Sequence, residues 1–330
     1  MPTVSLIICT YQRPESVRRL LDSIKDQSAL PDEIIVVDAS LDGETESVIK
    51  KVTRPVLDRL IYIHTGENDR GLTRQRNVGT KKASGEIIAF LDDDTVPEKD
   101  YFEQLVACFD RHPEAIGVGG QITTDLDWRP ANLEKKPSFA VFRWENWEKP
   151  ESIRGIIRKL LGLASNLPPG WMPPFGHGRP SSYPPDGNDH QVEFIIGASS
   201  AWKAEIFKEI QFSTFFYDYG LYEDLDFCIR AGRLGSIYLS TSSQLEHYHA
   251  PGGRPNPFSY GKMVTRNGWY VWRQRWPNPR WTDRAKWWVI SLLMTLLRLI
   301  DFRNSGFKEA MGRITGLISI LISSPKLNED

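Results

Sequence analysis

The sequence has little of what would mark a disulfide-linked, zinc-binding or nucleic-acid-binding protein. Its 330 residues include three cysteines, Cys9, Cys108 and Cys228, which lie far apart and without CxxC spacing. We therefore expect buried free thiols in a reducing compartment, with neither disulfides nor a zinc site. The formal net charge of −1 gives the chain no overall attraction to a polyanion. Nucleic acid is accordingly not expected as a partner.

Two nucleotide-binding signatures and one targeting signature are also missing. The first apolar run is followed by TYQRP where a GxGxxG would stand, which disfavours an NAD(P)-dependent enzyme. The sequence lacks GxxxxGK[ST], which disfavours a P-loop nucleotidase. No basic stretch precedes the first apolar run, so a secretory signal is not indicated and the cytoplasm is the expected location.

The first 120 residues alternate between apolar runs and helical patterns. Continuous apolar runs predict four buried strands, at residues 4–10, 33–37, 60–63 and 87–91. Amphipathic helices are expected from Pro14 and from about Lys99. This alternation predicts an α/β fold with a mostly parallel central sheet covered by helices. Ligands bind at the carboxyl ends of such strands, where Thr10, Asp38 and Asp92 stand.

The regular pattern stops over residues 126–191, which are rich in Pro, Trp and Gly. A stretch of this length without regular structure is typical of a functional loop or an insertion. The pattern then resumes, with a helix starting near Tyr222 and two further helical segments after Arg284. We predict one α/β domain over residues 1–250 that contains this insertion, followed by a C-terminal helical segment over 251–330.

Three consecutive acids, Asp92, Asp93 and Asp94, directly follow the apolar run IIAFL. Their charges repel one another unless a cation or hydrogen-bond donors offset them. Carboxylate oxygens are hard ligands that suit Mg²⁺ or Mn²⁺, and these ions bind phosphate oxygens. A solvated acidic turn is the alternative. The position after a buried strand favours a metal site in which Asp92 and Asp94 are the ligands.

The order and spacing of several motifs give the chain a family resemblance. The segments are VSLIICTYQRP, VVDAS, GLTRQRNVGTKKASGEIIAFLDDD, IIGASSAW and YGLYEDLDFCIRAGRLG. Over roughly 1–122 and 192–250 the sequence resembles a family-2 glycosyltransferase of GT-A fold. The resemblance implies a Rossmann-like GT-A domain, a nucleotide-diphosphate sugar as donor, and Mg²⁺ or Mn²⁺ as cofactor.

The resemblance also assigns residues to the donor site. It implies a nucleobase and ribose site made of Thr10, Tyr11, Arg13 and Asp38. Arg76 and Asn77 match the family's ARNxG element and are expected to face the diphosphate or the donor sugar, and Asp93 is placed in the same donor site. Many members have a second Asp where this chain has Ala39. UDP is the favoured nucleotide, with dTDP next, because the resemblance leans that way.

Bond cleavage next to a diphosphate needs charge neutralisation, which a metal on Asp92 and Asp94 would supply. A carboxylate must also take the proton from the acceptor hydroxyl. The resemblance makes Asp224 that base and implies a single displacement with inversion. The alternative is that acids such as Glu223 and Asp224 stand in a first helical turn because they suit its dipole. For His247, the resemblance implies an approach to the metal or diphosphate; a structural role is the alternative.

The C-terminal segment is basic and rich in tryptophan. Residues 261–288 contain six of the eleven tryptophans and seven basic residues with one acid, a mixture that suits the lipid headgroup zone. The run 287–300 is too short to span a bilayer and includes Arg298. Its polar stripe consists of Ser291, Thr295 and Arg298. We predict that this run and 307–321 form amphipathic helices lying on a membrane. Packing on the α/β domain or on a second subunit of an oligomer is the alternative.

Taken together, the sequence predicts an inverting glycosyltransferase that transfers a sugar to a hydroxyl acceptor, a glycan or a lipid-linked glycan. The tryptophans of residues 126–191 could bind the acceptor by stacking, or pack as a lid. The expected location is the cytoplasm, including its membrane face. A catalytically inactive sugar-nucleotide binding protein and a sugar nucleotidyltransferase remain as alternatives.

Overall fold

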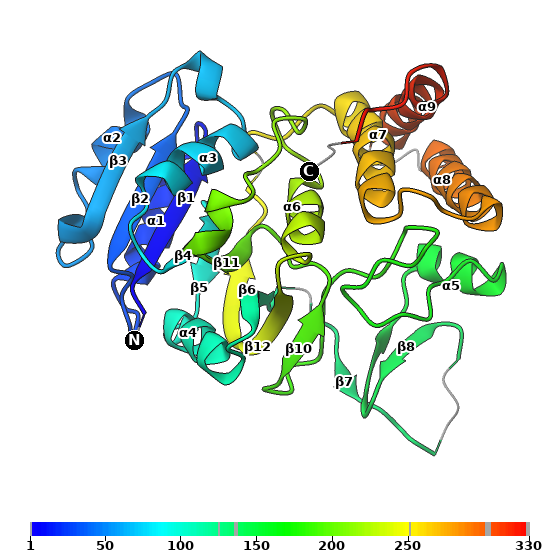
Figure 1. The fold of residues 1–330 in the computed structure, drawn as a ribbon, viewed down its shortest axis with the longest axis horizontal. Helices are drawn as coiled ribbons and strands as arrows, with labels where there is room; N and C mark the ends of the chain where they lie inside the picture. The colour runs from blue at the N-terminus through cyan, green and yellow to red at the C-terminus, as the bar shows by residue number, and fades with distance from the viewer. Residues whose placement is uncertain (1, 125, 135–137, 251, 301–304, 328–330) are drawn as a thin grey trace. The chain divides into compact units, whose positions relative to one another are not determined.

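The computed structural model describes residues 2–124, 126–134, 138–250, 252–300 and 305–327. The chain divides into two compact units: residues 1–126 with 181–254, and residues 127–180 with 255–330 (Figure 1). Most of the segment expected as an insertion, and nearly all of the segment expected after the α/β domain, therefore belong to the second unit. Each unit is described here by itself.

The first unit is built on a mixed sheet of nine strands among the residues described. Its strands run in the order β10 (Asp189–Val192), β12 (Ser236–His247), β6 (Ala115–Ile122), β11 (Ser199–Lys203), β4 (Ile87–Asp92), β1 (Val4–Thr10), β2 (Glu33–Asp38) and β3 (Leu60–His64), and β5 (Thr95–Pro97) pairs with β12. Only β10, β11 and β5 run against the others. The expected α/β fold with a mostly parallel central sheet is confirmed.

The continuous apolar run of β1 is explained by helices on both faces of the sheet. Successive side chains of a strand point to opposite faces. Leu6 and Ile8 belong to the core that also contains Leu20 of α1 (Pro14–Ile24). Ile7 points the other way, where a Cβ on Gly79 of α3 (Leu72–Lys82) would lie 2.6 Å from its Cγ2 atom. A strand covered on both faces cannot alternate with polar residues, which is why its sequence reads VSLIICT.

Three more helices complete the first unit: α2 (Glu44–Ile49), α4 (Tyr101–Arg111) and α6 (Glu223–Ala231). Helix α4 buries five apolar side chains and packs along β6 and β12. Each such burial contributes about 1.5–3 kcal/mol to folding. Among the described residues the cysteines are all free, and Cys108 and Cys228 are buried.

The second unit contains a small antiparallel sheet and four helices. Its elements are β7 (Arg129–Pro130), β8 (Val141–Trp144), β9 (Trp147–Pro150), α5 (Ile153–Leu160), α7 (Pro257–Arg275), α8 (Trp281–Ile300) and α9 (Gly306–Ile322). Helices α7 and α9 cross with their backbones in contact. A Cβ on Gly261 would lie 2.0 Å from the Glu309 carbonyl oxygen, and one on Gly312 would lie 1.9 Å from that of Phe258.

The segment 126–191 was expected to lack regular structure, and this expectation is wrong in part. It contains β7, β8, β9, α5 and most of β10. The four strands are only two to four residues long. Three of them are rich in charged or aromatic residues that do not alternate with apolar ones, so no period-two pattern marks them. In the part of the chain that the structure describes, no helix has the length and apolarity needed to cross a bilayer.

Candidate active site

A pocket of about 340 Å³ opens in the first unit at the carboxyl ends of β1 and β4. This size is at the lower end of what small-molecule sites occupy. Its polar lining includes Tyr11, Arg13, Arg70, Asp92, Asp93 and Asp218. The pocket therefore lies where parallel strands of an α/β sheet usually bind ligands, and it is lined by groups of both charges.

Beside this pocket the structure brings together Asp92, Asp94 and His247. One ligand atom of each lies within 4.8 Å of those of the other two. Asp92 ends β4 and Asp94 stands in the turn after it, whereas His247 ends β12. The antiparallel pairing of β12 with β5 places His247 opposite Thr95, directly after that turn. The Nε2 atom of His247 lies 3.0 Å from Oδ1 of Asp94.

The electrostatics of this cluster suit a cation. Burial raises the pKa of Asp94, but the His247 hydrogen bond and charge, with the Ala250 N–H, outweigh it and lower the pKa to about 2. Burial lowers the pKa of His247, but Asp94 and Asp92 leave it raised overall. Two carboxylates and an imidazole form a donor set that fits Mn²⁺ or Mg²⁺. A metal would replace the imidazole proton, since ligation needs the neutral ring.

Asp93 is held between the loop after β1 and the turn after β4. Thr10 donates its hydroxyl hydrogen to Oδ2 of Asp93 at 2.7 Å, and Nη1 of Arg13 lies 2.9 Å from Oδ1. Burial raises the pKa of Asp93 to about 6, although Arg13 and Thr10 oppose this shift. The Thr10 hydroxyl therefore forms its hydrogen bond within the protein, to Asp93. Tyr11 lines the pocket, with the Arg70 guanidinium 5.8 Å from its ring centroid.

Arg76 and Glu223 form a buried ion pair beneath the pocket. Nη1 of Arg76 lies 2.6 Å from Oε1 of Glu223, and its Nη2 atom donates to the Gly197 carbonyl oxygen at 3.1 Å. Asp92 lies further away, at 3.5 Å. Burial raises the pKa of Glu223 to about 8, although Arg76 opposes this shift. Arg76 therefore ties the middle of α3 to the start of α6 and the end of β4, and its expected contact with the donor stays a prediction.

Asp224, the predicted base, follows Glu223 in the first turn of α6. Its carboxylate accepts hydrogen bonds from the N–H groups of Gly197 at 3.0 Å and Leu225 at 2.9 Å. Burial raises the pKa of Asp224, and these two N–H groups oppose the shift. Tyr222 precedes the helix with φ of 71°, a left-handed conformation that sets the direction in which α6 begins.

Two other residues predicted to contact the sugar-nucleotide donor, Asp38 and Asn77, form hydrogen bonds within the protein. Asp38 is fully buried, and its oxygens accept from the Tyr62 hydroxyl and the Ser40 N–H, each at 2.8 Å. Asn77 exchanges two hydrogen bonds with the backbone of Phe212, at 2.9 and 3.0 Å. Neither side chain is among those that line the pocket. In this structure both order the walls around the site, and their contact with a nucleotide stays a prediction.

Sequence reasoning missed several residues that shape the pocket. Gln75 donates to the carbonyl oxygens of Thr10 and Val37, each at 2.9 Å, and so ties the ends of β1 and β2 together. Arg70 and Asp218 line the pocket directly. Arg70 and Gln75 stand in or next to the GLTRQRN motif, which was a usable signal. Asp218 directly precedes the YGLYEDLDF motif, which offered the same kind of signal.

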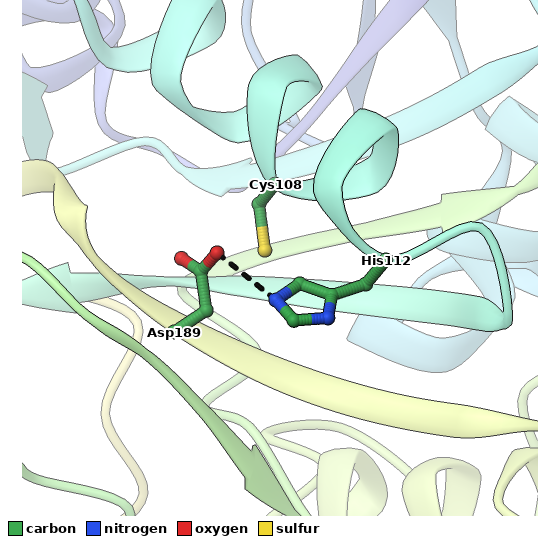
Figure 2. Close-up of side chains that lie close together, drawn as sticks. All are labelled: Cys108, His112 and Asp189. Atoms are coloured by element: carbon green, nitrogen blue, oxygen red, sulfur yellow. Dashed lines mark hydrogen bonds and ion pairs between the residues drawn. The ribbon is translucent and has the colours of Figure 1, made fainter.

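A second cluster of metal-ligand types lies on α4 and β10 (Figure 2). Cys108, His112 and Asp189 have ligand atoms within 4.8 Å of one another. Arg111 already donates to both oxygens of Asp189, at 2.7 and 3.0 Å, and the His112 ring stacks on Tyr238. Burial raises the pKa of the Cys108 thiol, which opposes the thiolate that a metal needs. Through the Arg111–Asp189 hydrogen bonds this cluster fastens α4 to β10.

Comparisons with known proteins identify the family that the chain resembles. The profile of glycosyl transferase family 2 matches residues 5–167. The glucosyl-dolichyl phosphate glucuronosyltransferase of Haloferax volcanii is 30% identical over 140 residues, or 41% of this chain and 41% of that protein. The chain matches 30–41% of the length of the first curated relatives.

Two solved structures share the fold. The mannosyltransferase PcManGT from Pyrobaculum calidifontis, solved with GDP-Man and Mn²⁺, has a TM-score of 0.52 at 15% identity, over 98% of this chain and 76% of that chain. GalNAc-T7, solved with UDP, GalNAc and Mn²⁺, has a TM-score of 0.53 at 16% identity, over 100% of this chain and 60% of that chain. At such identities the likeness establishes the fold alone, and the expected GT-A fold is confirmed.

Proposed function

Because this chain belongs to glycosyl transferase family 2 through residues 5–167, we propose that it is an active, inverting transferase. It moves a sugar from a nucleotide-diphosphate sugar to a hydroxyl group of an acceptor. The observation that carries the proposal is the convergence of Asp92, Asp94 and His247 beside the pocket. The fold alone does not require two carboxylates and an imidazole to lie together beside this pocket, whereas metal-dependent transfer does.

We propose that Asp92, Asp94 and His247 hold Mg²⁺ or Mn²⁺. When bound, the ion supplies Lewis-acid stabilisation to the diphosphate leaving group. Arg70 lines the same pocket and offers N–H donors to phosphate oxygens, and Tyr11 offers an aromatic face to a base. Asp93, held by Thr10 and Arg13, keeps the two loops at a fixed separation.

Asp224 is the proposed base. The acceptor oxygen forms a bond to the anomeric carbon while the bond from that carbon to the diphosphate breaks. The acceptor proton passes to the carboxylate of Asp224. Burial raises the pKa of this carboxyl group, which makes its anion a better proton acceptor. The hydrogen bonds from Gly197 and Leu225 hold the carboxylate in one orientation.

For the donor we propose UDP first and dTDP second, and for the acceptor a glycan or a lipid-linked glycan. The two solved structures of similar fold contain GDP-Man in one case and UDP with GalNAc in the other. They therefore do not determine which nucleobase this chain binds. The Haloferax protein is named for a lipid-linked substrate, glucosyl-dolichyl phosphate, which supports a lipid-linked acceptor here. Asp38 would contribute to the choice of nucleobase, because the hydrogen bond that it accepts from the Ser40 N–H holds the loop after β2.

A donor screen tests this function. UDP-, dTDP- and GDP-sugars are incubated with the protein and Mn²⁺, and release of the nucleoside diphosphate is measured. We expect release from UDP-sugars, with a fall of about 10²–10⁴ in Asp224→Asn and unchanged UDP binding by calorimetry. Asp110→Asn, at an exposed position of α4, is the matched control and should behave as wild type. Binding without turnover of any donor would mean an inactive binder, and pyrophosphate release from a nucleoside triphosphate would mean a nucleotidyltransferase.

A further inference from the structure

Helix α8 in the second unit has large apolar side chains on its packed side and also on its exposed side. Its buried side includes Ser291 and Thr295, which are 4% and 3% exposed. Its outer stripe consists of Trp281, Val289, Leu292, Leu296 and Ile300, which are 50–79% exposed. A surface helix in water normally buries its apolar stripe and exposes its polar one. Here Trp287 and Ile290 are buried beside this polar pair, and further large apolar side chains point out.

Helix α9, which packs against α8, likewise has apolar side chains on both its packed and its exposed side. Its inner side carries Glu309 and Arg313, paired at 2.7 Å, and Nε of Arg298 from α8 lies 3.1 Å from Glu309. Its outer side consists of Phe307, Met311, Ile318, Leu321 and Ile322, which are 39–80% exposed. The two helices therefore share an interior in which an ion-paired cluster lies among apolar side chains such as Leu317 and Ile320, and both have an apolar exterior. Exposed apolar patches of this extent mark interaction sites.

The charge around these helices indicates what covers them. Over residues 257–330, twelve basic residues stand against five acids, whereas the whole chain has 41 basic and 42 acidic residues. Arg280, Arg284 and Lys308 are exposed at the helix ends, next to the apolar stripes. A second copy of the chain would bring two strongly positive segments together, which Coulomb repulsion opposes. An anionic bilayer surface offers both an apolar phase and the opposite charge.

We propose that the outer face of α8 and α9 binds the surface of an anionic membrane, with both helices lying in the interface plane. Trp281, the most exposed residue of the stripe on α8, would occupy the headgroup region that suits its amphipathic ring. The apolar stripes enter the acyl boundary, and Arg280 and Arg284 contact lipid phosphates. This inference does not depend on the proposed transfer reaction, because it concerns binding alone.

Co-sedimentation with vesicles tests the proposal. Full-length protein is mixed with phosphatidylcholine vesicles containing 30% or no phosphatidylglycerol, at low and high salt. We expect binding to the anionic vesicles that weakens with salt, and a loss of about fivefold for each basic residue removed in Arg280→Gln and Arg284→Gln. Protein that stays in the supernatant with anionic vesicles at low salt overturns the proposal.

A matched pair of charge insertions locates the binding surface. Leu292→Glu with Leu296→Glu should lower vesicle binding at least tenfold, because two carboxylates would enter the apolar boundary. Leu41→Glu, at an equally exposed leucine in the first unit, should bind as wild type. Unchanged melting confirms that the variants fold. Equal binding by both variants overturns the proposal, as does a dimer in gel filtration that the double variant alone abolishes.

Discussion

At pH 9, above the pKa of about 8 to which burial raises Glu223, replacing Glu223 by Gln should destabilise the first unit strongly, because Arg76 would remain buried without its counter-charge. Both side chains are buried, and their closest atoms lie 2.6 Å apart. Breaking a buried pair from one side costs about 3–5 kcal/mol. Arg76 would keep the Gly197 carbonyl and the more distant Asp92, so we expect a value of about 3 kcal/mol. Against a total stability of about 5–15 kcal/mol this is a large fraction.

Thermal and urea unfolding measure this cost. At about 2–4 °C per kcal/mol, the melting temperature of Glu223→Gln should fall by about 6–12 °C. The double variant Arg76→Met, Glu223→Leu should regain most of that loss, because no unpaired charge remains. Glu15→Gln breaks an exposed pair with Arg18 and should leave the midpoint unchanged. An unchanged midpoint in Glu223→Gln at pH 9, where the carboxyl is ionised, would refute the reasoning, since it would mean that Arg76 needs no counter-charge.

Two further predictions concern the second unit. Gly312→Ala should lower its stability by about 1–3 kcal/mol, measured by urea unfolding, because the new methyl group would meet the backbone of α7; full stability would show that the helices can separate without cost. Burial raises the pKa of Glu151, but hydrogen bonds from Arg179 and Lys159 lower it overall. Because folding lowers the pKa of Glu151, the ionised carboxylate stabilises the fold fully when the pH is above the unfolded pKa of 4.5. This stabilisation is lost as the pH falls through the pKa of the folded state. The stability difference between wild type and Glu151→Gln should therefore be full at pH 7 and disappear under acid conditions, and a difference independent of pH would contradict this assignment.

Much of the first unit could be predicted because its strands are buried on both faces. Such strands read as continuous apolar runs, and the residue that follows each run lies at the ligand-binding edge. Asp92 and Asp94 could therefore be placed from the sequence. Their approach to His247 was implied only by family resemblance, because it depends on the pairing of β12 with β5, some 150 residues away in the chain.

The parts that could not be predicted depend on long-range contacts. Asp38 ends its strand as expected, but only the fold brings the Tyr62 hydroxyl onto its carboxylate. Arg76 matches a motif associated with the donor, yet a glutamate 147 residues away takes its guanidinium. The short strands β8 and β9 were not predicted from the sequence, because their charged and aromatic residues do not alternate with apolar ones. Local pattern carries little information where tertiary contacts decide.

The metal site is the central claim, and Mn²⁺ titration followed by electron paramagnetic resonance tests it most directly. Wild type, Asp94→Asn and Asp189→Asn are titrated with Mn²⁺ in the presence of UDP. We predict that Asp94→Asn weakens binding at least about tenfold, because it removes a ligand of the Asp92–Asp94–His247 cluster. Asp189→Asn, in the cluster already neutralised by Arg111, should bind as wild type. Equal affinity in wild type and Asp94→Asn, or a loss confined to Asp189→Asn, would contradict the account.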